Sequence, residues 1–266
     1  MRLLTLNTHS LAEENYDDKC DIFVNSVIKL KPDVIAMQEV NQSIDAEVLD
    51  KESNLKADNH GLKVLNKLKE KNVIYYLSWL CIKKAYGKYD EGLAFLSKTP
   101  ITATEPITIS KTDDYYNWKT RKAFVINTNN FYFCNTHMGW WNDKDEPFRQ
   151  QFDKLNESIL KYKQIYLMGD FNSPSNIENE GYGYVCSKGW KDTYMLSREK
   201  DIGYTVKGKI AGWENYDEEY KRIDYIFTKG NEDILKSQVV FNGTNEKIVS
   251  DHYGVMVDIK MKAGIL

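Results

Sequence analysis

The sequence predicts an α/β fold in which two packed β-sheets carry helices on their outer faces. Short apolar runs recur along the chain and end in polar residues, several segments between residues 73 and 136 have the composition of successive antiparallel strands, and three longer segments have apolar residues at helical spacing. Two sheets with helices outside would bury all of these apolar surfaces. The chain has 266 residues and no linker, repeat or low-complexity tract, so one domain, residues 1–266, is expected.

Three helices are expected. Residues 17–31 combine helical apolar spacing with acidic residues at the start, and Pro32 stops the segment. Residues 61–71 have leucines at helical spacing. Residues 146–161 form the third predicted helix, which Pro147 opens because proline suits the first turn of a helix.

The remaining elements are strands and loops. Besides the short runs at polar ends described below, strands are expected at residues 73–83, 92–97, 101–109, 122–128 and 131–136. Asn129 and Asn130 form the turn of a hairpin between the last two. The polar stretch 41–59 is expected to be a surface loop or a helical insertion.

The most informative motif is Gly169-Asp170-Phe171-Asn172, which directly follows the apolar run 164–168. Glycine stops a short apolar run abruptly, as at the end of a buried strand. In an extended segment residues two apart point the same way, so Asp170 and Asn172 would project into one cleft. One is an anionic acceptor and the other can donate hydrogen bonds, which suits a metal or phosphate site.

The same arrangement recurs along the chain. Asn7 follows the run 2–6, Gln38 and Glu39 follow 33–37, His137 closes the strand that starts at Phe131, Asp224 lies inside 223–227, and Asp251 and His252 precede 255–257. Apolar strands that end in such residues would gather polar groups at one edge of a sheet, where α/β enzymes build their sites.

These motifs, in this order, resemble those of the endonuclease/exonuclease/phosphatase superfamily, which has the DNase I-like fold. The matching segments are Thr-Leu-Asn-Thr-His with Asn7, Met-Gln-Glu-Val with Glu39, Asp-Glu-Gly-Leu-Ala with Glu91, Asn-Thr-His-Met with His137, Gly-Asp-Phe-Asn with Asp170 and Asn172, Arg-Ile-Asp-Tyr-Ile with Asp224, and Ser-Asp-His with Asp251 and His252. The resemblance spans nearly the whole chain and implies a four-layer α/β sandwich of two mixed sheets flanked by helices.

A divalent metal site is expected at Glu39. An ionised carboxylate at the end of a strand buried on both faces needs a cation, hydrogen-bond donors or a raised pKa. With Asp251 as a second carboxylate and Asn7 as an amide oxygen, the ligands are all oxygen, which selects Mg²⁺ or Mn²⁺ over Zn²⁺. The alternative is that Glu39 is a surface carboxylate just past its strand.

The resemblance also implies partners for two histidines. Glu91 would orient His137 and Asp224 would orient His252, and each acid would favour the imidazolium form. The alternative for each histidine is a structural role at a strand end. His9, close to Asn7, is a candidate lining residue of the cleft.

The expected reaction is hydrolysis of a phosphate ester by in-line attack of water. Asp170 would deprotonate the water, Asn172 and His252 would hold non-bridging oxygens, and His137 would assist the departing oxygen. The metal would offset charge on phosphorus and on the leaving group.

Charge favours a small substrate. A formal net charge of -3 and a pI near 5.9 give no general attraction to polyanions, and Lys119, Arg121 and Lys122 come closest to a basic stripe. Because a local stripe can exist in an acidic chain, a nuclease or phosphodiesterase acting on DNA or RNA stays as the alternative. A non-catalytic binding protein is a weaker one.

Aromatic segments are expected at the mouth of the cleft, at residues 115–118, 138–141 and 212–216. Trp140, Trp141 and Trp213 could stack on sugar rings or bases, or could instead anchor their loops. The chain is most similar to small bacterial members of the superfamily, including the maltose 6'-phosphate phosphatase group. This resemblance implies action on a sugar phosphate, with Lys119 and Arg121 as candidate ligands of the phosphate dianion. Arg121 could equally be a structural ion-pair partner.

The expected location is the cytoplasm. The four cysteines lie far apart without a Cys-x-x-Cys pair, as expected of small buried hydrophobes in a reducing compartment. No secretory signal precedes the first strand and no apolar run is long enough to cross a bilayer. A monomer without a membrane partner is expected.

Overall fold

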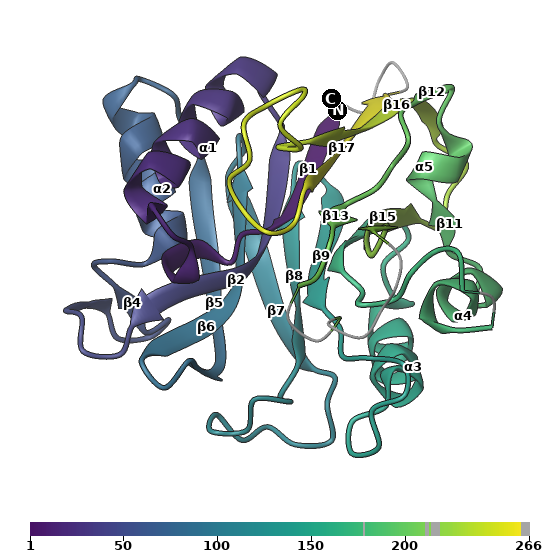
Figure 1. Cartoon of the computed structure of the whole chain (residues 1–266), viewed down its shortest axis with the longest axis horizontal. Helices are drawn as coiled ribbons and strands as arrows, with labels where there is room; N and C mark the ends of the chain where they lie inside the picture. The colour runs from purple at the N-terminus through teal and green to yellow at the C-terminus, as the bar shows by residue number, and fades with distance from the viewer. Residues whose placement is uncertain (178, 211–212, 214–218, 262–266) are drawn as a thin grey trace.

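The computed structural model describes residues 1–177, 179–210, 213 and 219–261 and contains two large β-sheets (Figure 1). The first sheet contains β1 (Arg2–Asn7), β2 (Val34–Ser43), β5 (Tyr76–Ala85), β6 (Tyr89–Ser97), β12 (Glu199–Lys200), β16 (Asp233–Val240) and β17 (Gly254–Lys260). Its strand order is β12-β16-β17-β1-β2-β6-β5. The second contains β7 (Ile101–Thr108), β8 (Lys122–Thr128), β9 (Phe131–His137), β10 (Ile165–Asp170), β11 (Lys191–Asp192) and β15 (Asp224–Thr228). Its order is β11-β15-β10-β9-β8-β7.

The other elements are helices and two small two-stranded sheets. The helices are α1 (Tyr16–Leu30), α2 (His60–Glu70), α3 (Phe148–Ile159), α4 (Gly181–Ser187), α5 (Thr193–Leu196) and the 3₁₀ turn η1 (Ser10–Ala12). The small sheets pair β3 (Val48–Asp50) with β4 (Leu55–Lys56), and β13 (Val206–Lys207) with β14 (Tyr220–Lys221). None of the described helices is long and apolar enough to cross a membrane.

The sheets and helices form four layers, as the sequence predicted. Leu3, Phe95, Phe133 and Met168 belong to the core between the two sheets. Helices α1 and α2 pack on the outer face of the first sheet, and α3 and α4 pack on that of the second (Figure 1). Successive residues of a strand point to opposite faces, which is why Leu4 packs under the helices while Leu3 faces the other sheet. The DNase I-like architecture is therefore confirmed.

Buried amides tie the two sheets together. Gln38 Nε2 donates to Asn135 Oδ1 over 2.6 Å, and Asn135 Nδ2 donates to the carbonyl oxygens of Met37 and Ala94 over 2.9 and 3.1 Å. All donors and acceptors of this bridge lie in the protein interior, where unpaired amides would be costly. The bridge fixes how the end of β2 sits over β9, and so how the site residues of the two sheets face each other.

The prediction for the polar stretch 41–59 was wrong, because this stretch is neither a simple surface loop nor a helical insertion. β2 continues to Ser43, and β3 and β4 follow. Gln42 is fully buried but has partners for its amide: it accepts from Lys56 N and Asn59 Nδ2 and donates to Asp90 Oδ2. The polar composition here predicted exposure. Burial could not be predicted, because the hydrogen bonds that permit it come from residues distant in sequence.

The helix predictions were within two residues of the observed bounds for α1, α2 and α3. Strand β16, by contrast, has no counterpart among the predictions. Its sequence mixes charged and apolar residues, and it is held in the sheet by pairing with β17. On its other side β17 pairs with β1, and this second pairing brings the segment before β17 to the site edge.

Acid sensitivity is expected from buried His60. Burial and the Lys63 charge lower the pKa of His60 from 6.5 to about 3, so the folded protein holds the ring neutral while the unfolded chain protonates it below pH 6.5. Stability is therefore lost as pH falls through this window. We expect the free energy of unfolding to drop between pH 7 and pH 5 by about 2 kcal/mol more in the wild type than in His60→Gln. Urea denaturation at both pH values measures this difference, and equal drops would contradict it.

Candidate active site

The site lies where strands of both sheets end. β1 pairs with β2 in parallel and β9 pairs with β10 in parallel, so their carboxyl ends meet at one edge. Asp170 is in register with His137 on one side and with Asp224 on the other. A cavity of about 400 Å³ opens at this edge, and its lining includes His9, Glu39, Lys83, Tyr86, Glu91, Trp118, Arg121, His137, Trp140, Asp170, Asn172, Asp251 and His252.

A tight turn after β10 presents Asp170 and Asn172. Gly169 has φ 143°, and a Cβ there would lie 1.9 Å from the Thr136 carbonyl oxygen of β9, so only glycine allows the close approach. Asn172 adopts φ 45°, a conformation that asparagine tolerates, and its backbone N–H donates to Asp170 Oδ1 over 2.8 Å. The Gly-Asp-Phe-Asn motif is thus needed for the backbone conformation of this turn as well as for the side chains that the turn presents.

A bulge places Glu39. The register between β2 and β6 shifts between Met37 and Val40, and Glu39 adopts φ 48° within the shift. A bulge turns a side chain away from the regular alternation of its strand. Glu39 Oε1 then accepts from Asn7 Nδ2 over 2.9 Å and lines the cavity.

Asp224, His252 and Asp170 form a connected chain of charges. His252 Nδ1 lies 3.0 and 3.2 Å from the two Asp224 oxygens, and its Nε2 lies 3.8 Å from Asp170 Oδ2. Burial alone would lower the pKa of His252, but the Asp224 and Asp170 carboxylates raise it well above its usual value. His252 is therefore an imidazolium oriented by Asp224, the pairing expected from the sequence.

His137 differs from the expectation. Glu91 does not contact it: Glu91 Oε1 lies 3.2 Å from Lys83 Nζ, opposite it in the β5–β6 register. His137 Nε2 instead accepts from Asn172 Nδ2 over 3.1 Å and lies 3.5 Å from Asp170 Oδ2. Burial, together with the Arg121 and Lys83 charges, lowers the pKa of His137 well below 6.5. A neutral imidazole follows, rather than the expected imidazolium.

The surroundings of Asp170 suit a general base. Burial and the nearby Asp224 charge raise its pKa to about 7, although His252 and the donors from Asn172 and Asn7 oppose the shift. Its Oδ2 accepts from Asn7 Nδ2 over 3.1 Å. A carboxylate with a pKa near neutrality can take a proton from water and release it again at physiological pH.

The carboxylates of the cavity suit a divalent cation. Burial and the charges of Glu91 and Asp251 raise the pKa of Glu39, and an ion coordinated here would relieve that repulsion. Oxygen ligands of this kind favour Mg²⁺ or Mn²⁺. Asn7 has a different part from the one expected, since its oxygen accepts from His9 N over 3.2 Å while its Nδ2 holds Glu39 and Asp170.

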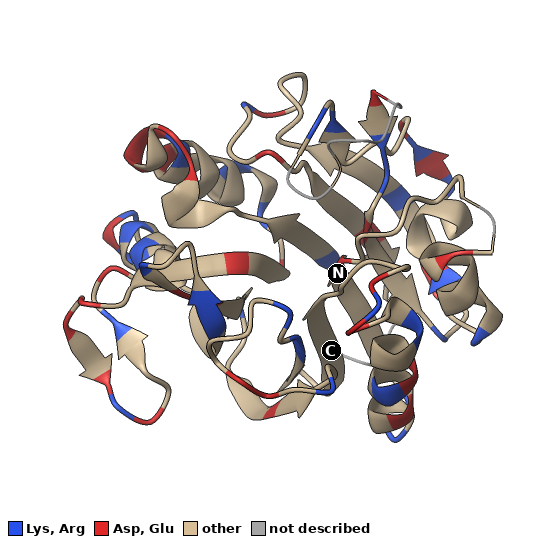
Figure 2. Ribbon diagram, turned by 60° about the horizontal axis from the view of Figure 1, so that its bottom comes forward, with Lys and Arg blue, Asp and Glu red and all other residues tan. Residues whose placement is uncertain are grey.

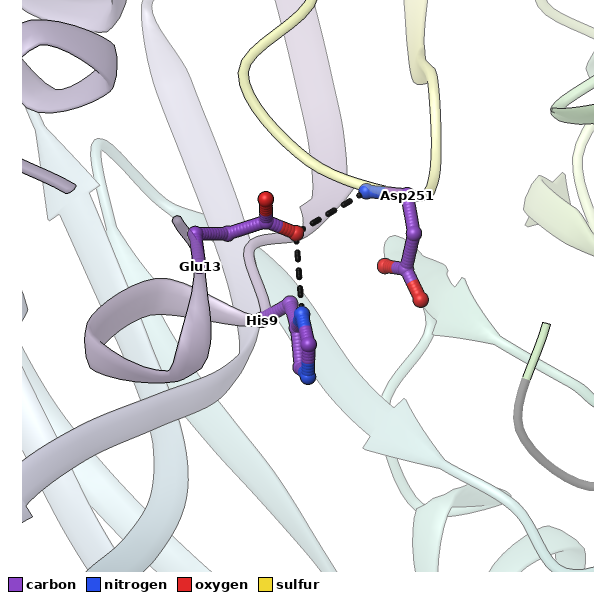
Figure 3. A group of neighbouring side chains, drawn as sticks. All are labelled: His9, Glu13 and Asp251. Carbon is purple, nitrogen blue, oxygen red and sulfur yellow. Dashed lines mark hydrogen bonds and ion pairs between the residues drawn. The ribbon is translucent and has the colours of Figure 1, made fainter. Parts of the chain in front are cut away.

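His9 and Asp251 are joined by an acid that the sequence analysis missed. One Glu13 oxygen accepts from His9 Nδ1 over 2.8 Å and from the backbone N–H of Asp251 over 3.2 Å (Figure 3). Burial opposes a charged His9 ring, but Glu13, Asp251 and Glu39 together raise its pKa to about 9. The spacing of four residues between His9 and Glu13 is the signal that could have revealed the pair.

Lys119 and Trp141, both predicted substrate residues, lie outside the cavity lining and are held by other contacts. Lys119 Nζ is paired with Asp143 and Asp145 over 2.8 and 2.7 Å, so its charge is already satisfied. Trp141 packs against Phe148 and Tyr184, with ring centroids 5.8 Å apart in each case, and thus anchors its loop. The loop acids that hold Lys119 come from a distant segment, which composition could not reveal.

Other predicted substrate residues do reach the site. Trp140 and Arg121 line the cavity, and Trp213 Nε1 donates to Asn172 Oδ1 over 3.1 Å. The rest of the expected aromatic segment 212–216 lies outside the described residues. Lys83 and Tyr86 also line the cavity and were not foreseen, because in sequence they are ordinary residues of a strand and a turn.

Two packed mixed sheets, with acids, amides and histidines gathered where their strands end, define the DNase I-like class of α/β folds. The model of the Endonuclease/Exonuclease/phosphatase family matches residues 4–252, and the chain belongs to this family. Its members are hydrolases that act on phosphate esters, generally with a divalent metal. The chain matches none of the curated proteins.

Solved structures agree with this assignment. An endonuclease/exonuclease/phosphatase family protein from Leptotrichia buccalis C-1013-b is 31% identical, with a TM-score of 0.86 over 98% of this chain and 100% of that chain. A mannosyl-6-phosphatase from Bacteroides thetaiotaomicron VPI-5482 is 17% identical, with a TM-score of 0.66 over 98% and 100%. A 3' phosphatase from Neisseria bound to a product DNA hairpin is 14% identical, with a TM-score of 0.65 over 98% and 100%. Because the last two are only 17% and 14% identical to this chain, they show a likeness of fold alone.

Proposed function

We propose that this protein is a Mg²⁺-dependent phosphatase that hydrolyses a small phosphorylated substrate, most specifically a sugar-phosphate monoester, and that it works as a cytoplasmic monomer. The observation that carries the proposal is the cavity. Its volume of about 400 Å³ lies in the range of small-molecule sites, and it combines the acids and histidines with the aromatic walls of Trp118, Trp140 and Tyr86. Aromatic faces beside polar groups suit a hydroxylated ring.

In the proposed mechanism Asp170 orients the attacking water and takes its proton. Asn172 and the His252 imidazolium hold the non-bridging oxygens, and Asp224 keeps His252 charged and oriented. His137 assists the leaving oxygen. Its neutral ring must first receive a proton or share one with water, so it is a weaker acid candidate than His252. Mg²⁺ bound at Glu39 and Asp251, with Asn7 positioning Glu39, would supply positive charge to the phosphate oxygens.

The charge distribution supports a small substrate over a polynucleotide. Lys and Arg segments are interspersed with Asp and Glu segments along the ribbon (Figure 2). The sequence cluster nearest to a basic stripe is neutralised or buried: Lys119 and Lys122 pair with acids, and Arg121 is only 5% exposed. A path of free surface cations, which nucleic acid binding requires, does not arise from this cluster.

The test is a substrate panel assayed for inorganic phosphate with Mg²⁺ and with a chelator. It should contain glucose 6-phosphate, mannose 6-phosphate, maltose 6'-phosphate, p-nitrophenyl phosphate, its bis ester and plasmid DNA. We expect Mg²⁺-dependent release from at least one sugar phosphate, with kcat/KM well above that for the bis ester. Inert sugar phosphates beside DNA cleavage that falls steeply with salt would replace this proposal by a nuclease.

A further inference from the structure

The turn after β1 contacts the backbones of both proposed metal ligands. Ser10 Oγ, in η1, donates to the Glu39 carbonyl oxygen over 2.8 Å and accepts from Asn41 N over 2.9 Å, so it holds the β2 bulge. Glu13, which directly follows η1, accepts from the backbone N–H of Asp251 over 3.2 Å. Glu39 belongs to β2 and Asp251 to the segment before β17. One short turn thus joins two ligands that are distant in sequence.

Glu13 is held by three donors from different segments. Its Oε1 accepts from Asp251 N and from His9 Nδ1, and both bonds are drawn in Figure 3. Its Oε2 accepts from Lys19 Nζ of α1. The side chain is only 9% exposed, so water does not compete freely for these oxygens. A carboxylate fixed in this way has one position, and that position determines where the Asp251 backbone lies.

The same turn has an unfavourable backbone conformation. His9 and Ser10 have φ angles of 45° and 36°, in the left-handed region that residues other than glycine seldom adopt. Two such residues in succession persist only where surrounding contacts hold them. Here those contacts include the Glu13 bond to the His9 ring and the Ser10 bonds to β2. Loss of the Glu13 contacts should let the turn relax, and the Asp251 backbone would no longer be fixed.

Glu13 is not itself placed to hold the cation. His9, Glu13 and Asp251 offer ligand atoms within 4.8 Å of one another. However, both Glu13 oxygens already accept hydrogen bonds, and Glu13 does not line the cavity. Its charge is also offset by the Lys19 ammonium. Glu13 therefore acts on the site through the main chain of Asp251.

We propose that Glu13 is a positioning residue that sets the affinity of the cavity for its divalent cation, by fixing Asp251 relative to Glu39. This inference rests on the proposed function and concerns its metal site. A cation bound by two carboxylates from separate segments gains affinity when both are held in place beforehand, because binding then costs less ordering. Replacing a group that orients a metal ligand typically weakens metal binding by about 10- to 100-fold.

Two conservative variants separate the effect of position from that of charge. Glu13→Gln loses the charge but keeps a carbonyl oxygen at the length that reaches Asp251 N. Its amide nitrogen would face Lys19, whose side chain is 25% exposed and can turn to water. Glu13→Asp keeps the charge but is shorter by a methylene group, so its oxygens no longer reach Asp251 N. If position matters, the shorter acid should be the more damaging of the two changes.

Mn²⁺ is the probe, and the electron paramagnetic resonance signal of the free ion measures its binding without substrate or turnover. We expect Mn²⁺ to bind Glu13→Asp at least about tenfold more weakly than the wild type. Glu13→Gln should bind Mn²⁺ at least about threefold more tightly than Glu13→Asp, because it retains one more hydrogen bond. Equal affinities in the two variants, the reverse order, or wild-type affinity in Glu13→Asp would overturn the inference. So would a wild type that binds no Mn²⁺.

Glu246→Asp is the matched control. Glu246 also fastens the segment before β17 to α1, since its Oε1 and Oε2 accept from Lys29 Nζ and Ser26 Oγ over 2.6 and 3.0 Å. Its side chain is 13% exposed, close to the value for Glu13, and these bonds do not involve Asp251. We expect Mn²⁺ affinity to be unchanged in this variant. An equal loss in Glu246→Asp would show that any loosening of the segment weakens the site, which contradicts a specific role of Glu13.

The unfolding temperature gives a readout that a purely structural residue would not change. In the presence of a chelator, Glu13→Asp and Glu246→Asp should both be somewhat less stable than the wild type, since each loosens the contacts of a half-buried acid. At one fixed concentration, Mg²⁺ should raise the unfolding temperature of the wild type and of Glu246→Asp more than that of Glu13→Asp. Equal shifts in all three proteins would mean that Glu13 only stabilises the fold.

These binding measurements separate the inference from the proposed function. Hydrolysis of sugar phosphates by a protein whose Mn²⁺ affinity does not depend on Glu13 would refute the positioning role alone. Mn²⁺ binding that depends on Glu13, in a protein that hydrolyses no phosphate ester, would instead refute the proposed function and leave the positioning role intact.

Discussion

Asp170→Asn is expected to reduce kcat by at least about 10³-fold while leaving the protein folded. The carboxylate is the only group in the proposed mechanism that takes the proton of the attacking water. Its pKa near 7 is matched to that task, and asparagine has no basic oxygen to replace it. Assays of p-nitrophenyl phosphate and of the best sugar phosphate, at saturating substrate, measure the loss.

The fold should tolerate this change. An asparagine oxygen can still accept from Asn172 N, now 2.8 Å from Asp170 Oδ1, and the variant loses the unfavourable proximity of the Asp170 and Asp224 charges. The amide that replaces Oδ2 faces the Asn7 donor, which costs about one hydrogen bond, roughly 1 kcal/mol. Thermal unfolding should therefore shift only slightly.

Asp192→Asn is the matched control. Asp192 is also a buried carboxylate, but it pairs with Arg222 at 2.5 Å, accepts from Tyr194 N at the start of α5, and does not line the cavity. Removing one partner of a buried pair costs about 3–5 kcal/mol. We thus expect this variant to lose stability and keep its kcat. Near-normal turnover in Asp170→Asn would remove the base from the mechanism.

The parts of the site that the sequence predicted are those with local signals. Asn7, His137 and Asp170 are each the polar end of an apolar strand, and the parallel pairing of those strands brings such ends together whatever the rest of the chain does. The superfamily motifs added the pairing of Asp224 with His252. The layered fold followed from the same alternation of strands and helices.

Long-range register determined the parts that the sequence could not predict. Lys83 reaches Glu91 only because β5 and β6 pair with a register shift between Cys81 and Lys83, which places the two residues opposite each other. Glu91 is thus paired with Lys83, and Lys83 adds a second cation to the cavity wall. The fate of Lys119 depends likewise on acids in a separate loop. Pattern and propensity carry no information on such pairings.

Glu39→Gln is expected to uncouple the protein from Mg²⁺. In the wild type, a chelator should abolish activity and Mg²⁺ should restore it, because Glu39 is a proposed carboxylate ligand of the ion. We expect the variant to lose about 10²-fold or more in activity at limiting Mg²⁺, with partial recovery as the metal concentration rises. Titration of Mg²⁺ against initial rate distinguishes this loss of metal affinity from a loss of the chemical step.

Stability provides the second measurement, independent of turnover. A ligand present at 100 times its Kd stabilises the folded state by about 2.7 kcal/mol, so Mg²⁺ should raise the unfolding temperature of the wild type and have little effect on Glu39→Gln. Glu105→Gln is the control. Glu105 lies on β7, pairs with Lys161 and does not line the cavity.

The most informative comparison is between the stabilities of the wild type and Glu39→Gln without Mg²⁺. Glu39 is buried beside Glu91 and Asp251, and this surrounding raises its pKa. Replacing it with neutral glutamine removes repulsion among like charges and keeps an acceptor for Asn7 Nδ2. Without Mg²⁺ the variant should therefore be at least as stable as the wild type, so that the ion, when present, reverses the order of the two proteins. If Mg²⁺ stabilises both proteins equally, the ion is held by other groups and Glu39 is not its ligand.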